Sequence, residues 1–376
     1  MSIKAEKNFS LKDQLFNEET VSELADALGG AHRQFDRAAF LKQVLDKFPE
    51  LELKARIAHI VDVLGEHLPA ELPKAIKILE AALPEPLDPT KTDDDFGTFI
   101  WAVPGEYVAR HGCNDEYFEL SLRFLREATK RFTSENPIRP FLKQFNARTM
   151  AFVHECTSDE NYHVRRLASE GIRPFLPWAP RADVAVDDIL LVLDKLYLDE
   201  TRYVTRSVAN TLNDIAKIEP DKVVDTLARW NASTPDNKEV QWLTKHALRT
   251  LLKDDFPDAL SLLGYAHKPS FKLVEESATK PVKVGEDFRW SCRLESKKAQ
   301  LLKVTLKVYF LKANGSHSTK VFAIKDATFK KGETLNIQKK QSFKPITTRT
   351  LYPGEHKADL VINGVVAATV SFDVIE

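Results

Sequence analysis

The sequence predicts a mainly α-helical chain in which two-helix units are stacked in series, followed by a small β-sandwich. Three observations support this fold class. Apolar residues recur at helical spacing over residues 11–263, similar segments recur at a period of about 40 residues, and apolar and polar residues alternate after residue 270. We therefore expect two domains, at residues 1–267 and 268–376.

Length and composition are those of a soluble globular protein. The chain has 376 residues, of which 43% are hydrophobic, and this is enough for two domains with apolar cores. No run approaches the roughly 18 apolar residues that cross a bilayer, and the N-terminal sequence MSIKAEKNFS lacks the apolar segment of a secretory signal. We expect a monomer in the cytoplasm that makes no use of a membrane.

The first helices are predicted from apolar residues at three- and four-residue spacing. This spacing occurs in NEETVSELADAL (17–28), FDRAAFLKQVLDKF (35–48) and LELKARIAHIVDVLGEHL (51–68). Asp36 precedes the second segment, and its short side chain can accept a hydrogen bond from the first turn. Helices in series are the simplest interpretation.

Residues 161–180 are predicted to form one helix with an abrupt end. Its apolar side consists of Val164, Leu167, Ala168 and Ile172. A charged side, at spacing i, i+4 and i+7, consists of Arg166, Glu170 and Arg173. Pro174 ends the helix because it cannot donate a backbone hydrogen bond, and two further prolines stiffen the connector that carries Trp178.

Three segments align at offsets of about 40 residues, beginning at Glu160, Glu200 and Glu239. An earlier segment from Glu50 places Arg56 at the equivalent position. A period near 40 with two helices per unit is typical of HEAT and armadillo repeats, whose equivalent helices lie side by side. The aligned basic positions are Arg166, Arg206 and Lys245, and one turn later stand Glu170, Asn210 and Arg249.

We expect the aligned basic residues to form one column across neighbouring repeats. Such a column suits a phosphate backbone, because each Lys or Arg that neutralises a phosphate also releases counterions. The alternative is that these residues pair with nearby carboxylates on a solvated surface. Residue spacing alone leaves both interpretations open.

Two short segments resemble each other. SENPIRPFL (134–142) and SEGIRPFL (169–176) each place a glutamate ahead of an Ile-Arg-Pro-Phe-Leu sequence. If both segments face the same side, the carboxylates of Glu135 and Glu170 and the indole of Trp178 gather in one place.

The C-terminal part changes to the alternating pattern of strands. Residues 304–310 alternate between apolar and polar, and Asn363-Gly364 is a strong signal for a β-hairpin. We expect an immunoglobulin-like sandwich of about 100 residues without its inter-sheet disulfide, because Cys292 has no partner there, and we expect Trp290 in its core. From residue 270 onward there are 19 basic and 11 acidic residues, a net charge of +8 that suits an anionic partner.

Several kinds of site are absent from the sequence. It contains no phosphate-binding glycine loop, nucleophile elbow or zinc deaminase signature, and the three cysteines have no CxxC spacing. His154, His163 and His246 also lack the spacing of metal ligands. We expect no metal and no cofactor. What remains is a set of carboxylates beside an aromatic residue within a basic column. A glutamate there repels the DNA phosphates, so its presence suggests a target that carries positive charge, such as a cationic base.

Four segments resemble the AlkC branch of the AlkC/AlkD DNA glycosylases: RFTSENPIRPFL (131–142), HVRRLASEGIRPFLPWA (163–179), YVTRSVANTLNDIAK (203–217) and WLTKHALRTLLK (242–253). The resemblance covers residues 11–267, and the basic β-sandwich is similar to an immunoglobulin-like extension of some members. It implies HEAT-like repeats that bind double-stranded DNA containing alkylated bases. The implied activity is excision of N3-methylated bases such as 3-methyladenine and 3-methylcytosine without base flipping, in a bacterial-type cytoplasm at the nucleoid.

By the same resemblance, Glu135 and Glu170 are expected as catalytic carboxylates and Trp178 as the aromatic residue that contacts the lesion. The residues expected to contact DNA are Arg165, Arg166, Arg173, Arg206, Lys245 and Arg249. Two alternatives come from the residues themselves. Glu170 could merely pair with Arg166 one turn earlier, and the protein could be a non-enzymatic HEAT-repeat scaffold that binds nucleic acid or protein.

Overall fold

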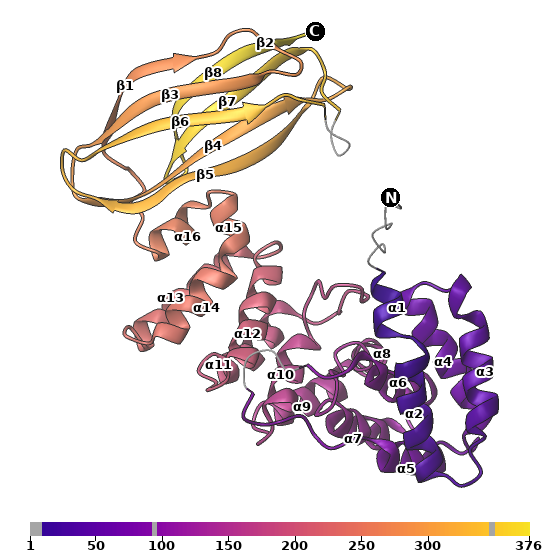
Figure 1. Ribbon diagram of the computed structural model, residues 1–376. Helices are drawn as coiled ribbons and strands as arrows, with labels where there is room; N and C mark the ends of the chain where they lie inside the picture. The colour runs from indigo at the N-terminus through magenta and orange to yellow at the C-terminus, as the bar shows by residue number, and fades with distance from the viewer. Residues whose placement is uncertain (1–9, 92–95, 346–349) are drawn as a thin grey trace. The chain divides into compact units, whose positions relative to one another are not determined.

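The computed structural model describes residues 10–91, 96–345 and 350–376, which are helical in the first part of the chain and form strands in the last (Figure 1). Contacts within the described chain divide it into two compact units. The first unit comprises residues up to 218 together with 234–247, and the second comprises 219–233 and 248–376. The fold class predicted from the sequence is confirmed.

The regular elements of the first unit, over its described residues, are helices. They are α1 (Leu11–Leu15), α2 (Glu18–Ala31), α3 (Arg37–Lys47), α4 (Leu53–His67), α5 (Leu72–Ala82), α6 (Ala102–Gly112), α7 (Phe118–Ala128), α8 (Arg139–Gln144), α9 (Asn146–Cys156), α10 (Tyr162–Glu170), α11 (Val186–Leu196), α12 (Arg202–Ile215) and α14 (Lys238–Ala247), with short 3-10 turns η1 (Phe48–Glu50) and η2 (Phe99–Trp101). Asp36 caps α3 as expected, because its side chain accepts from the backbone N–H of Ala39 at 3.0 Å. No helix in the described ranges is long and apolar enough to cross a lipid bilayer.

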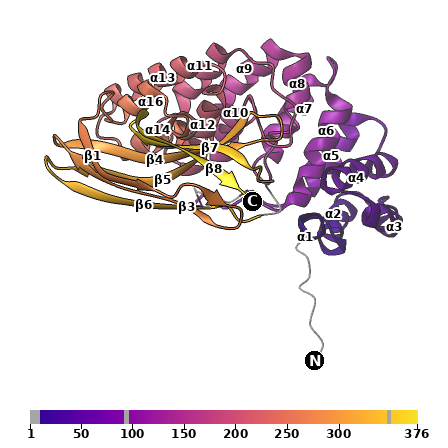
Figure 2. The same cartoon turned by 90° about the horizontal axis from the view of Figure 1, so that it is seen from above.

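The predicted repeat corresponds to α10, α12 and α14. Helix α10 contacts α12, and α12 contacts α14, so equivalent helices are neighbours. Figure 2 shows α9 and α11 in one row and α10 and α12 in the other. The aligned apolar residues Val164, Val204 and Leu243 are all buried. The aligned apolar positions of the repeat are therefore interior positions of neighbouring helices.

Two details of the repeats differ from the prediction. Helix α14 ends at Ala247, so Arg249 does not continue it and instead begins α15 in the second unit. Arg56, the early basic position, is buried and binds the side chain of Asp13 and backbone carbonyls, among them that of Phe16 at 2.7 Å. Its guanidinium donates hydrogen bonds to carbonyls inside the fold, so Arg56 does not contribute to a basic surface.

The helix predicted over residues 161–180 is shorter in the structure. Helix α10 ends at Glu170 with Gly171 as its C-cap, so Arg173 lies beyond the helix. A Cβ atom at Gly171 would lie 2.8 Å from Cγ2 of Ile138, which means that only glycine allows the two Ile-Arg-Pro-Phe-Leu segments to approach so closely. The similar segments of the sequence are thus packed against each other.

In its described residues, the second unit contains three helices and eight strands. The helices are α13 (Pro220–Ser233), α15 (Arg249–Lys253) and α16 (Pro257–Leu262). The strands are β1 (Phe271–Ala278), β2 (Val282–Lys283), β3 (Asp287–Ser296), β4 (Gln300–Leu311), β5 (His317–Phe329), β6 (Thr334–Ser342), β7 (Gly354–Ile362) and β8 (Val365–Ile375). They form sheets of order β1-β3-β6 and β2-β8-β7-β4-β5, with a shared apolar core that includes Trp290 and Cys292 as expected.

The predicted hairpin joins β7 to β8. Asn363 and Gly364 both have positive φ, 48° and 79°, as a tight hairpin turn requires. The Asn363 side chain donates to the carbonyl of Ala266 at 3.3 Å, and Lys303 on β4 pairs with Asp255 at 2.7 Å. These contacts explain why α15 and α16 group with the strands, whereas the sequence placed the boundary between residues 267 and 268.

Candidate active site and nucleic-acid interface

Arg166 brings the two predicted catalytic carboxylates together. Its Nη1 donates to Oε2 of Glu135 at 2.5 Å, and its Nη2 lies 3.4 Å from Oε1 of Glu170. Thr133 also donates to Oε2 of Glu135, at 2.8 Å. The similar segments of the sequence therefore meet through one guanidinium, which fixes the position of both acids.

Glu170 is held by its neighbours on both carboxylate oxygens. Oε1 accepts from Nη1 of Arg173 at 2.6 Å, and Oε2 accepts from the hydroxyl of Ser207 on α12 at 2.6 Å. Burial opposes ionisation, but the charges of Arg166 and Arg173 outweigh it and lower the pKa of Glu170 below its ordinary value. Glu170 is therefore a buried carboxylate with a hydrogen bond on each oxygen.

The chain of alternating charges continues beyond Glu170. Nε of Arg173 donates to Oδ2 of the buried Asp214 at 3.0 Å, and Lys217 pairs with Oδ1 of Asp214 at 3.1 Å. We call Glu135, Arg166, Glu170, Arg173 and Asp214 the charged cluster. Burial disfavours the charged form of Arg173, yet Glu170 and Asp214 raise its pKa, so Arg173 remains a guanidinium cation.

The two glutamates differ in what they can offer a ligand. The Glu135 side chain is 18% exposed and that of Glu170 is 5% exposed. Among the described residues, Glu135 accepts hydrogen bonds on one of its two oxygens, Oε2. Both oxygens of Glu170 accept hydrogen bonds. Glu135 is thus the carboxylate that can reach another molecule.

Trp178 stands in an unusual backbone conformation. Its φ is +63° and its side chain is largely exposed, with 62% of the residue accessible. A bulky residue in this left-handed region costs about 1–3 kcal/mol, and such strain persists only where the surroundings enforce it. The segment 171–180, which we call the Trp178 loop, therefore presents the indole to solvent.

Arg139 is a residue of this site that the sequence did not single out. It is 5% exposed, and its guanidinium donates to three carbonyls of the Trp178 loop: those of Gly171 at 3.0 Å, Arg173 at 3.1 Å and Pro180 at 2.8 Å. Arg139 occupies the position in its Ile-Arg-Pro-Phe-Leu segment that Arg173 occupies in the other. That correspondence was the available signal.

The residues predicted to contact DNA fall into two groups. Arg165, Arg166 and Arg173 have internal carboxylate partners, and Arg165 binds Asp199 at 2.6 and 3.0 Å. A guanidinium that donates to carboxylates has few N–H groups left for a phosphate. These three arginines are therefore poorly placed for the predicted contact with DNA. The second group is more accessible: Arg206 on α12 is half-buried, and Lys245 on α14 and Arg249 on α15 are exposed.

A stacked set of side chains lies on the same two helices as Arg206 and Lys245. The guanidinium of Arg202 lies 3.8 Å from the ring centre of Trp242, whose ring stacks on His246 at 5.0 Å. His246 in turn lies 3.1 Å from the side-chain oxygen of Asn210. The sequence did not single out Arg202 or Trp242, because a stack between helices 40 residues apart has no local pattern.

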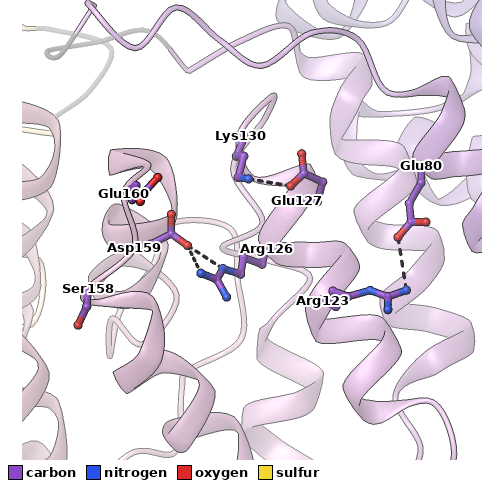
Figure 3. Close-up of a pocket in the computed structure, with 8 residues that line it drawn as sticks. All are labelled: Glu80, Arg123, Arg126, Glu127, Lys130, Ser158, Asp159 and Glu160. Atoms are coloured by element: carbon purple, nitrogen blue, oxygen red, sulfur yellow. Dashed lines mark hydrogen bonds and ion pairs between the residues drawn. The ribbon is translucent and has the colours of Figure 1, made fainter.

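Two cavities of the first unit lie away from the charged cluster and Trp178. One, of about 600 Å³, is lined by paired charges, and Figure 3 shows the ion pairs Arg123–Glu80, Arg126–Asp159 and Lys130–Glu127. A second, of about 660 Å³, shares Lys130 and Asp159 with it. Neither is lined by Glu135, Glu170 or Trp178, so the candidate site is not one of these two cavities.

Comparison with known proteins identifies relatives along the whole chain. A family model described as the C-terminal immunoglobulin-like domain of the uncharacterised protein YhaZ matches residues 274–376. The uncharacterised protein YhaZ of Bacillus subtilis (strain 168) is 34% identical over 366 residues, which are 96% of this chain and 98% of that protein.

A solved structure shares both sequence and fold. Alkylpurine DNA glycosylase AlkC of Pseudomonas fluorescens, bound to DNA containing an abasic-site analogue, is 31% identical, with a TM-score of 0.82 over 98% of this chain and 100% of that one. This similarity includes the helical repeats and the immunoglobulin-like sandwich described above. The chain therefore belongs to the AlkC family of DNA glycosylases.

Proposed function

We propose that the protein is a DNA glycosylase of alkylation repair, which excises cationic N3-alkylated bases such as 3-methyladenine and 3-methylcytosine from double-stranded DNA. The observation that carries this proposal is Glu135, a carboxylate that Arg166 fixes in place and that keeps one oxygen available. Support comes from a relative with this fold, which is an alkylpurine DNA glycosylase.

The chemistry requires little more than a placed carboxylate. Alkylation at N3 gives the base a positive charge and makes it a good leaving group, so no general acid is needed. Cleavage of the glycosidic bond builds up positive charge on the sugar, which a carboxylate can stabilise while it orients the attacking water. We assign this role to Glu135. Glu170 then acts as a positioning residue, since it holds Arg166 and both of its oxygens are engaged by other side chains.

Trp178 supports recognition of the lesion outside a pocket. Its exposed indole can contact a cationic base through the ring face, which favours a cation by about 0.5–2 kcal/mol. A tryptophan that extends into solvent is suited to a base that stays in the duplex. We therefore propose that the enzyme acts without base flipping.

The direct test measures the release of 3-methyladenine from methylated duplex DNA. We expect the wild-type protein to release the free base and to leave an abasic site, and unmethylated DNA of the same sequence is the control. A protein that binds both DNAs but releases no base from either would be a scaffold, and the proposal would be wrong.

We propose that Lys245 and Arg206 hold the DNA backbone and that the second unit, with its basic strands, adds contacts. Replacing the exposed Lys245 (Lys245→Ala) is expected to weaken binding of damaged and undamaged DNA alike and to reduce the slope of log affinity against log salt by about 1. Affinity is measured between low and physiological salt. Lys42→Ala on α3, also exposed, is the matched control, and an equal effect of both would show only a loss of overall charge.

A further inference from the structure

The conformation of Trp178 requires an explanation that the charged cluster does not supply. Its left-handed φ is unfavourable for a tryptophan, and its exposed side chain gains little packing in return. The conformation must therefore be enforced through the backbone of the Trp178 loop. Two cationic side chains bind that backbone.

Arg139 binds both ends of the loop. It contacts the carbonyls of Gly171 and Arg173 where α10 ends and the carbonyl of Pro180 where the loop leaves the site. Two residues at the start of the Trp178 loop and one residue at its end thus bind the same rigid guanidinium. The distance between the ends of the loop is fixed, and the intervening residues must bulge outward.

Lys54 binds the middle of the loop. This residue is on α4, and its Nζ donates to the backbone carbonyl of Trp178 itself. The two residues are separated by 124 positions in the sequence, so the contact ties the N-terminal helices to the Trp178 loop. Lys54 is exposed and forms this bond at the surface of the first unit.

We propose that Lys54 and Arg139 are positioning residues that preset Trp178 for contact with the base. Arg139 sets the span of the loop, and Lys54 orients the Trp178 peptide so that the indole projects from the surface. The role in excision rests on the proposed function, whereas the restraint of the loop does not. A preset indole would meet the lesion without a conformational step, which lowers the cost of binding it.

The test replaces Lys54 by methionine (Lys54→Met), which keeps the length and helix propensity of the side chain but removes the donor. Lys77→Met, at an exposed lysine on α5, is the matched control. Amide hydrogen exchange in the free protein is expected to accelerate in residues 171–180 of Lys54→Met and to remain unchanged in the control. Equal exchange of the loop in Lys54→Met and wild type would overturn the proposal.

The second measurement is excision under single-turnover conditions. Lys54→Met is expected to slow release of 3-methyladenine by about tenfold, because weakening the contact between the indole and a cationic base costs a factor of this order. In a Trp178→Ala background it should have no further effect, because Lys54 acts through Trp178. An unchanged rate in Lys54→Met, or an equal loss in both backgrounds, would overturn the role in the reaction.

Arg139→Lys extends the test to the ends of the loop. A lysine keeps the charge but cannot contact three carbonyls at once, so we expect the loop to exchange faster than in Lys54→Met. If the buried substitution prevents folding, Lys54→Met decides the proposal alone. If the wild-type protein excises no base, the proposed glycosylase activity fails, and hydrogen exchange still shows whether these two residues restrain the loop.

Discussion

Replacing Glu135 by glutamine (Glu135→Gln) is expected to lower the rate of base excision by about 100- to 1000-fold, the usual effect of removing a group that stabilises transition-state charge. Glutamine preserves the size of the side chain and its bond to Arg166, but it carries no negative charge to offset the charge that develops on the sugar. DNA affinity should change little, since Glu135 contributes none of the cationic charge that attracts phosphate.

This prediction is checked with single-turnover excision and equilibrium binding on the same methylated duplex. Glu155→Gln is the matched control, because Glu155 is exposed on the neighbouring helix α9 and lies outside the charged cluster. Wild-type excision by Glu135→Gln, together with loss of excision in Glu170→Gln, would transfer the catalytic role to Glu170.

Replacing Glu170 by glutamine (Glu170→Gln) is expected to destabilise the protein by about 3–5 kcal/mol, the usual cost of leaving a buried charge without its partner. Arg166 loses one of two carboxylates, and Arg173 keeps only Asp214. The free energy of unfolding is measured in urea. Glu135→Gln is the comparison, and a smaller loss is expected there because Glu135 is more exposed. Equal losses would contradict the distinction between the two acids.

The same substitution changes the dependence of stability on pH. The pKa of Glu170 is lower in the folded protein than its ordinary value of 4.5, so its stabilising contribution is complete above that value. It disappears as the pH falls through the lowered folded value, when the carboxylate becomes protonated. Stability of the wild type should therefore decrease more steeply below about pH 4.5 than stability of Glu170→Gln.

Local patterns in the sequence predicted most of the fold. Helical spacing and the 40-residue repeat identified the helices that became α10, α12 and α14, and Asn363-Gly364 identified a hairpin, because each feature depends on neighbouring residues. The grouping of α15 and α16 with the strands was not predicted. It depends on contacts such as Lys303 with Asp255, which no periodicity reveals.

The sequence singled out the two acids of the candidate site, but it did not indicate which arginines have internal partners. The two similar segments suggested that Glu135, Glu170 and the indole of Trp178 gather in one place, and the two acids do meet at Arg166. That Arg139 binds backbone carbonyls and Arg165 binds a carboxylate was not foreseeable, because the same residues at the same spacing also occur on solvated helices. An arginine is identified as internal only when its tertiary partners are known.

The alternation of charge in the charged cluster also limits which substitutions can accumulate at its positions during evolution. Each internal member touches partners of opposite sign, so a change that neutralises Glu170 alone leaves Arg173 and Arg166 short of a counter-ion. Divergence at these positions should proceed by compensated pairs, with a lost carboxylate accompanied by a lost guanidinium. Among distant relatives, the identities at positions 170 and 173 are expected to covary, whereas the exposed Lys245 can vary independently.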